Sequence, residues 1–226
     1  MSEIPQPPPV VHPSGVIPQA LVDKIVARRG GRLHVHPTLD GSRTAFVVID
    51  LDEHSCGRCE TDDQLYGPVN AVAAAVRATG GTVAFVTTSI RSPEALEGVL
   101  GADLAAEYYA ENGPGGAGTR LAGRLDVHPG DLRAVKARAS AFFPGNCNLH
   151  ARLRARGIEY VLVGGLVTNV CCESSARDAH ELGYRVTMVS DALGGQSFGL
   201  HEASLATFFR IFGDVRPSRE VIDMLS

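Results

Sequence analysis

The sequence predicts a three-layer α/β/α sandwich with a mostly parallel, doubly wound sheet. Short, continuously apolar strands alternate along the chain with helices of about 8–15 residues, and the turns between them hold many of the 25 glycines among the 226 residues. Strands that are apolar throughout are typical of a sheet covered by helices on both faces. Because right-handed crossovers join such units, we expect the ligand site beyond the carboxyl ends of the strands.

The expected strands cover residues 45–49, 82–89, 132–138, 160–166 and 185–190. The expected helices cover residues 68–79, 94–112, 149–156, 168–182, 201–212 and 218–225. The helix over 68–79 would begin with Pro68 in its first turn and end at Gly80. The chemistry should therefore lie just after residues 49, 89, 135, 166 and 190.

The N-terminal residues differ in composition from the rest. Residues 1–18 hold six of the 13 prolines, a pattern that favours an extended arm over a part of the core. This arm is either a disordered tail or a segment that wraps a neighbouring subunit. We divide the chain into a Pro-rich arm and lead-in over residues 1–30 and one α/β domain over residues 31–226.

Composition limits the partners and the compartment. The net charge is −4 and the isoelectric point is about 6.0, which gives no electrostatic reason to expect nucleic acid or a membrane as partner. The longest apolar runs are too short to span a bilayer, and the first residues lack the pattern of a signal peptide. Five cysteines are an odd number at low density, which favours a reducing compartment. A cytoplasmic enzyme with a small-molecule substrate is the expectation.

Asp50 closes the first expected strand. A carboxylate at the end of a buried apolar strand is costly unless it is paired or hydrogen-bonded. The position suits a catalytic acid or base. The alternative is an aspartate that caps the following turn.

Lys136 stands at the end of the third expected strand. Of 21 basic residues, only Lys24 and Lys136 are lysine. A chain so biased toward arginine is expected to keep lysine where a compact ammonium group with an adjustable pKa is useful. The alternative is a chance surface lysine.

Two cysteines follow the fourth expected strand, which ends in glycines and leads through Thr168 and Asn169, both good N-caps, into a helix. Cys171 would lie in the first helical turn, where free N–H groups favour a thiolate and can bind an oxyanion. The alternative is an inert buried thiol. Cys172, rotated by about 100°, would face the core.

Taken together, these features resemble the isochorismatase-like cysteine hydrolase family from about residue 44 to the end. Residues 46–50 look like the family's first strand with its catalytic aspartate. Residues 135–143 look like its lysine motif, and residues 165–179 look like its nucleophile motif. The resemblance implies an isochorismatase-like hydrolase domain over 31–226, in which Asp50, Lys136 and Cys171 form the catalytic triad.

The resemblance also implies a mechanism. Cys171 attacks the substrate carbonyl to form a thioester, while Asp50 takes the thiol proton and later gives it to the leaving amine. Lys136 holds Asp50 in place and favours the thiolate. The backbone N–H groups of Val167 and Cys171 form the oxyanion hole, and the peptide bond between Leu166 and Val167 is cis.

Substrate contacts are expected at Phe142 and Asn169. Phe142 follows the lysine motif, where family members commonly place an aromatic ring against the substrate. Asn169 is the second candidate, and capping of the helix is its alternative role. The family usually has Gln two residues after the catalytic aspartate, whereas this chain has Asp52. The added carboxylate would repel acidic substrates and favour neutral or cationic ones.

The implied reaction is cleavage of the C–N bond of a small amide, ureido or carbamoyl substrate, closest to the ureidoacrylate amidohydrolase branch. The alternatives are a lactam hydrolase of the streptothricin-hydrolase type, a hydrolase of the vinyl ether of isochorismate, and a binding or scaffold protein with a relic site. Because family members are usually dimers or tetramers, we expect a homo-oligomer.

Cys56 and Cys59 have a two-thiol spacing without a second pair to complete a tetrahedral metal site. His54 beside them leaves a zinc or redox role open. The alternative is a loop with two free thiols near the pocket. We expect neither a metal nor a cofactor.

Overall fold

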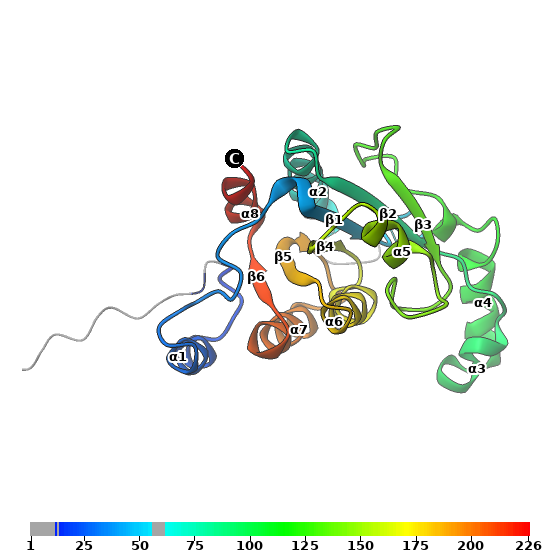
Figure 1. Ribbon diagram of the computed structural model, residues 1–226. Helices are drawn as coiled ribbons and strands as arrows, with labels where there is room; N and C mark the ends of the chain where they lie inside the picture. Colours follow the sequence, from blue (N-terminus) through cyan, green and yellow to red (C-terminus); the bar gives the residue numbers. More distant parts are fainter. Residues whose placement is uncertain (1–11, 13, 56–61) are drawn as a thin grey trace, which may run out of the picture.

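The computed structural model describes residues 12, 14–55 and 62–226, which form a sheet of six parallel strands between layers of helices (Figure 1). The strand order is β3-β2-β1-β4-β5-β6. The predicted three-layer, doubly wound sandwich is confirmed. The strands are β1 Thr44–Ile49, β2 Thr82–Thr88, β3 Leu132–Lys136, β4 Tyr160–Gly165, β5 Arg185–Leu193 and β6 Asp214–Arg216.

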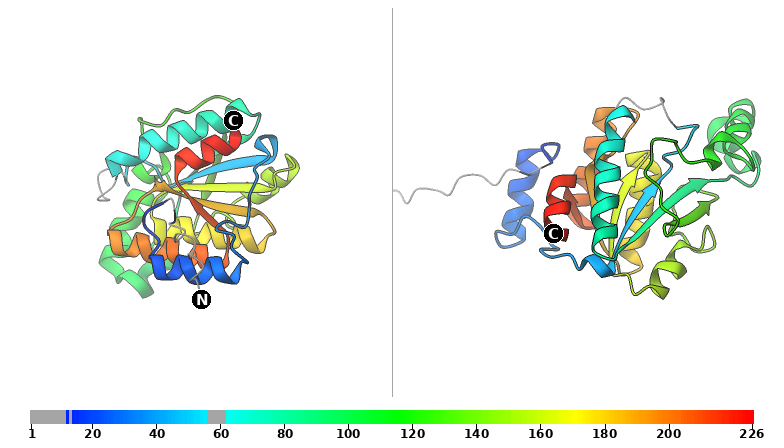
Figure 2. Two further views of the ribbon diagram at one scale, coloured as in Figure 1. Left: turned by 90° about the vertical axis from the view of Figure 1, so that its left-hand side faces the viewer. Right: turned by 90° about the horizontal axis from the view of Figure 1, so that it is seen from above.

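Helices cover both faces of the sheet (Figure 2). One face carries α2 Asp62–Ala78 and α8 Ser218–Leu225. The other face carries α1 Gln19–Arg28, α5 Leu149–Ala155, α6 Glu173–Glu181 and α7 Phe198–Ile211. The helices α3 Glu94–Leu100 and α4 Ala102–Asn112 lie together past the β3 edge (Figure 1). Among the described residues, no helix is long and apolar enough to cross a bilayer.

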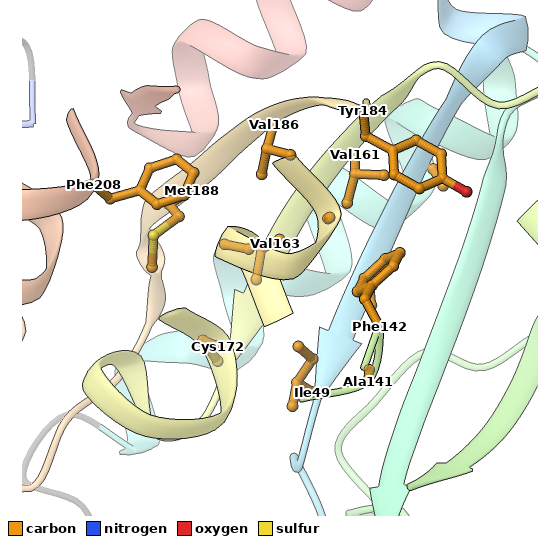
Figure 3. Packing of buried hydrophobic residues seen from close by; sticks show 14 of the residues in the cluster. Ile49, Ala141, Phe142, Val161, Val163, Cys172, Tyr184, Val186, Met188 and Phe208 are labelled. Carbon is orange, nitrogen blue, oxygen red and sulfur yellow. The ribbon is translucent and has the colours of Figure 1, made fainter. Parts of the chain in front are cut away.

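The sheet separates two apolar clusters, and β1, β2, β4 and β5 contribute to both. In β1, Val47 and Ile49 face the cluster under α5, α6 and α7, whereas Phe46 and Val48 face the cluster under α2 and α8. Successive side chains point to opposite faces, so a strand buried on both sides must be apolar throughout. Figure 3 shows the first cluster, where side chains of β4 and β5 meet Phe208 of α7 and Cys172.

Several elements differ from the prediction. The expected helix over 94–112 is two helices, because Gly101 between them has a φ of 79°, in the left-handed region. Helix α2 begins six residues before Pro68, which therefore lies inside the helix rather than in its first turn. Strand β6 was not expected. Neither was α1, which buries Val22 and Ile25 although it lies within the predicted lead-in. The division at residue 30 stays a prediction.

Candidate active site

The carboxyl edge of the sheet brings together the ends of four strands. Strands β2 and β3 follow β1 on one side, and β4 lies on its other side, so a crevice is expected where the order reverses, between β1 and β4. Asp50 directly follows β1, and its φ of 51° is in the left-handed region, which aspartate tolerates better than most residues. Its backbone N–H bonds to the carbonyl of Val86 at 2.9 Å, which fixes the turn against β2.

Lys136 links the polar groups of this edge. Its Nζ lies 2.8 Å from Oδ2 of Asp50 and 3.4 Å from Sγ of Cys171, and it donates to Oγ1 of Thr88 at 2.5 Å. The Thr88 hydroxyl in turn donates to Oδ1 of Asp50 at 2.9 Å. Lys136 is 1% exposed. These three contacts provide one partner inside the protein for each of its three ammonium protons. The structure therefore brings all three predicted triad residues together.

The protonation states follow from burial and charge. Burial alone would lower the pKa of Lys136, but the neighbouring Asp50 and Cys171 outweigh it and raise this pKa above its ordinary value. Burial, together with Asp50, raises the pKa of Cys171 to about 12, although Lys136 acts in the opposite direction. At neutral pH the Cys171 side chain is therefore a thiol rather than the expected thiolate. Asp50 is the carboxylate positioned to take its proton.

Cys171 lies in a short π-helical turn, Thr168–Cys172, which leads into α6. The expected position in the first turn of an α-helix is thus corrected. The Leu166–Val167 peptide bond is cis, as the resemblance implied. Cys172 is fully buried in the core, as predicted.

The backbone N–H groups around this turn have distinct partners. The N–H of Leu166 bonds to Ile49 at 2.8 Å, that of Thr168 bonds to Gly194 at 2.7 Å, and those of residues 170 and 172 bond to Val167 at 3.0 and 3.3 Å. These bonds hold the turn between β1 and the segment after β5. The bonded N–H groups are those on either side of residues 167 and 171. The N–H groups of residues 167 and 171 are the two that are expected to bind an oxyanion.

The two predicted substrate contacts lie differently in the structure. The ring of Phe142 is buried in the core, where it meets the ring of Tyr184 edge-on at 5.7 Å (Figure 3). Asn169 is half-buried in the π-helical turn, and the N-cap of that turn is Val167, so its alternative role as a cap is wrong. A substrate contact by Phe142 or Asn169 stays a prediction.

Two residues near the triad escaped the sequence analysis. Thr88 ends a buried apolar strand just as Asp50 follows one, so its position was the signal that could have identified it. Tyr108, on α4, has its pKa raised by burial and by the nearby charges of Cys171 and Asp50. It gave no sequence signal, because its place depends on how α4 packs.

Residues Cys56 and Cys59 lie outside the described part of the chain, so their role stays open. Asp52 and His54 precede them and are separated by one residue, so both side chains are candidates for metal ligands. Within residues 12, 14–55 and 62–226, no group of three or more His, Cys, Asp or Glu side chains is arranged to hold a metal ion.

Comparison with known proteins agrees with this geometry. The family model described as the isochorismatase domain matches residues 44–220. The chain belongs to the isochorismatase family. The match spans all six strands of the sheet and the three triad positions. Family members are hydrolases, among them cysteine hydrolases and amidohydrolases.

Three relatives illustrate the range of the family. The isochorismatase family protein YecD of Escherichia coli O157:H7 is 30% identical over 192 residues, which cover 83% of this chain and 98% of that protein. The ureidoacrylate amidohydrolase RutB of Variovorax paradoxus is 39% identical over 114 residues, 49% of this chain and 42% of RutB. A cysteine hydrolase from Pseudomonas syringae pv. phaseolicola superimposes with a TM-score of 0.76 at 25% identity, covering 85% of this chain and 96% of that one.

Proposed function

We propose that this protein is a cysteine-dependent amidohydrolase that cleaves the C–N bond of a small amide, ureido or carbamoyl substrate. The observation that carries the proposal is the contact of Lys136 Nζ with both Asp50, at 2.8 Å, and Cys171, at 3.4 Å. A nucleophile, a carboxylate base and a cation that orients the base are the parts that acyl transfer needs. The similarity to a ureidoacrylate amidohydrolase over half of the chain supports the same bond class.

The proposed reaction has two steps. Asp50 takes the thiol proton as Sγ of Cys171 attacks the substrate carbonyl, and the N–H groups of Val167 and Cys171 receive the developing oxyanion. The C–N bond then breaks, Asp50 passes the proton to the leaving nitrogen, and a thioester remains. Water, deprotonated by Asp50, attacks the thioester, and the acid is released as the thiol recovers its proton.

Lys136 serves this reaction without exchanging a proton. Its raised pKa keeps it charged, so it holds Asp50 in place and stabilises negative charge as it moves between carboxylate and sulfur. A thiol with a pKa of about 12 reacts only when its proton is removed during the attack. The nucleophile is therefore activated by bound substrate rather than held as a thiolate at rest.

Intact-mass spectrometry tests the proposal directly. The native protein and Cys171→Ala are mixed with a panel of small amides, ureas, carbamates and lactams, and the reaction is quenched in acid. We expect a mass increase equal to an acyl or carbamoyl group on the native protein alone. An unmodified native protein, with product formed from isochorismate instead, would refute amide hydrolysis. An adduct that also forms on Cys171→Ala would refute the assignment of the nucleophile.

A further inference from the structure

Tyr108 comes from a separate element, and its ring lies against the ring of His54 in the loop that follows Asp50. Burial is the largest cause that raises its pKa, and the acidic groups of Cys171, Asp50 and Asp52 act in the same direction, opposed by Lys136. This agrees with a place on the side of the triad, because such effects fall off with distance. The phenol remains protonated at neutral pH.

The ring of Tyr108 is supported by the loop that follows the catalytic aspartate. His54 meets it edge-on, with ring centres 5.9 Å apart and planes at 87°, and Nδ1 of His54 lies 3.5 Å from Oε2 of Glu111 one turn further along α4. Residues 51–53 pair in turn with residues 120–122 through two backbone hydrogen bonds of 3.0 Å. The loop after β1 and the end of α4 thus form one wall beside the triad.

The end of α4 that carries Tyr108 is also the anchored end. The carbonyl of Asn112 accepts the backbone N–H of Ile90 at 2.7 Å, and the Asn112 amide donates to the carbonyl of Tyr108 at 3.1 Å. Asn112 is buried against Gly118. By contrast, α3 buries none of its residues and extends away from the sheet (Figure 1).

Tyr108 itself is not part of the core. It is 38% exposed, so a large ring with a polar tip stays partly open at the place where a substrate would approach. A tyrosine with an apolar body and a wet hydroxyl is suited to covering a small ligand and donating one hydrogen bond to it.

We propose that Tyr108 is a substrate-binding residue, whose ring covers the Cys171 thiol and whose hydroxyl donates a hydrogen bond to the substrate on the side away from β4. The inference rests on the proposed amidohydrolase function. It assigns substrate recognition to the wall formed by residues 51–54 and the end of α4, in addition to the strand ends that hold the triad.

Kinetics of Tyr108→Phe, matched with Tyr109→Phe, test the hydrogen bond. The two variants remove the same atom from neighbouring residues of one helix, and Tyr109 points about 100° away. With an amide that acylates the native protein, we expect Tyr108→Phe to lower kcat/KM about 10-fold, mainly through KM, because one hydrogen bond is lost. Tyr109→Phe should leave both constants unchanged. Equal effects of the two variants, or no effect of Tyr108→Phe, would overturn the proposal.

Alkylation of Cys171 by iodoacetamide tests the cover without any substrate. We expect Tyr108→Ala to speed up alkylation several-fold, Tyr108→Phe to leave the rate near that of the native protein, and Tyr109→Ala to change it little. An unchanged rate in Tyr108→Ala would refute the cover. Failure of the proposed function looks different, because the native protein would then form no acyl adduct with any amide while these alkylation rates still differ.

Discussion

Asp50 and Lys136 form a buried ion pair next to a thiol that stays protonated at neutral pH. A buried pair gains little stability over an apolar pair of the same size, whereas removing one partner leaves an uncompensated charge. The pair is therefore better explained by chemistry than by folding. Its geometry depends on Thr88, whose hydroxyl accepts from Lys136 and donates to Asp50.

Replacing Thr88 with Val should impair catalysis more than folding. The change keeps the shape of the side chain but removes the hydroxyl between two charged groups, and hydrogen bonds to charged groups contribute about 1.5–3 kcal/mol. We expect kcat/KM to fall about 10- to 100-fold, mainly through kcat, because Asp50 loses its orientation. Thr88→Ser keeps the hydroxyl and should retain most of the activity. If Thr88→Ser is as impaired as Thr88→Val, packing rather than the hydrogen bond explains the loss.

The sequence was sufficient to bring Asp50, Lys136 and Cys171 to one place, but not to identify the groups around them. Asp50 and Lys136 could be identified because a buried charge at the end of a strand is costly unless it has a partner. Cys171 could be identified because it follows a strand that ends in glycines. Thr88 also stands at a strand end, but threonine is common in strands, and its partner becomes evident only when β2 and β3 are paired. Tyr108 depends on the fold of a helix that no sequence pattern places at the site.

At the scale of elements, Gly165 of β4 lies directly against the backbone of Ile49 in β1. This residue has a φ of 111°, and a Cβ there would overlap the carbonyl oxygen of Ile49. That carbonyl also accepts the N–H of Leu166 at 2.8 Å. The close approach sets the distance between Asp50 and the turn that holds Cys171, so both the fold and the site need glycine here.

Comparing Gly165→Ala with Gly157→Ala separates the cost of steric overlap from the cost of a positive φ. Gly157 also has a positive φ, of 70°, but a Cβ there would have no atom within 4 Å. We expect Gly157→Ala to lower the free energy of unfolding by about 1–2 kcal/mol, the strain of a left-handed residue. Gly165→Ala should cost more than about 4 kcal/mol or yield no folded protein. Urea unfolding followed by circular dichroism measures both, and equal costs would contradict the overlap.

Elements with strong periodicity were predictable, and those decided by tertiary contacts were not. The five expected strands are present. The nearly continuous apolar runs of β1, β2 and β4 have few other places to be buried, whereas β3 alternates between buried and exposed residues. The three-residue strand β6 is too short to give such a signal and forms because β5 offers its edge. Helix α1 follows a Pro-rich stretch, so the composition of this region predicts an extended arm rather than a helix. Only the structure shows that Val22 and Ile25 of α1 pack against the core.

At the scale of the whole molecule, a buried polar cluster joins the N-terminal segment to the β6 edge. Asp214 accepts two backbone N–H groups of residues 35–36, at 2.8 and 2.9 Å, and lies 3.6 Å from Nδ1 of His34. The buried ring of His12 meets His34 and Phe209 edge-on, at 5.8 and 4.8 Å. Two of the places where the described residues bury titratable groups are this cluster and Asp52, two residues after Asp50.

These two places oppose each other in their response to pH. Burial, with a contribution from His34, lowers the pKa of His12 from 6.5 to about 4. The unfolded chain therefore binds more protons between pH 4 and 6.5, and stability rises with pH in that range. Burial, with a contribution from Asp50, raises the pKa of Asp52 from 3.8 to about 6. The folded protein binds more protons between pH 4 and 6, and stability falls as pH rises there.

Single variants should separate these two opposing contributions to the pH profile. Each shift is worth about 3 kcal/mol across its range, because one pKa unit corresponds to about 1.4 kcal/mol. Burial also lowers the pKa values of His36 and His201, which adds to the rise of stability with pH. In Asp52→Asn the opposing contribution is lost, so we expect the free energy of unfolding to rise more steeply than in the native protein between pH 4 and 6. In His12→Gln a rising contribution is lost, so the free energy of unfolding should fall relative to that of the native protein as the pH goes from 4 to 6.5. Urea unfolding at half-unit pH steps measures both, and Asp126→Asn, an exposed carboxylate, is the control. Parallel profiles for Asp52→Asn and His12→Gln would contradict the opposition, because the two changes remove contributions of opposite sign in the same pH range.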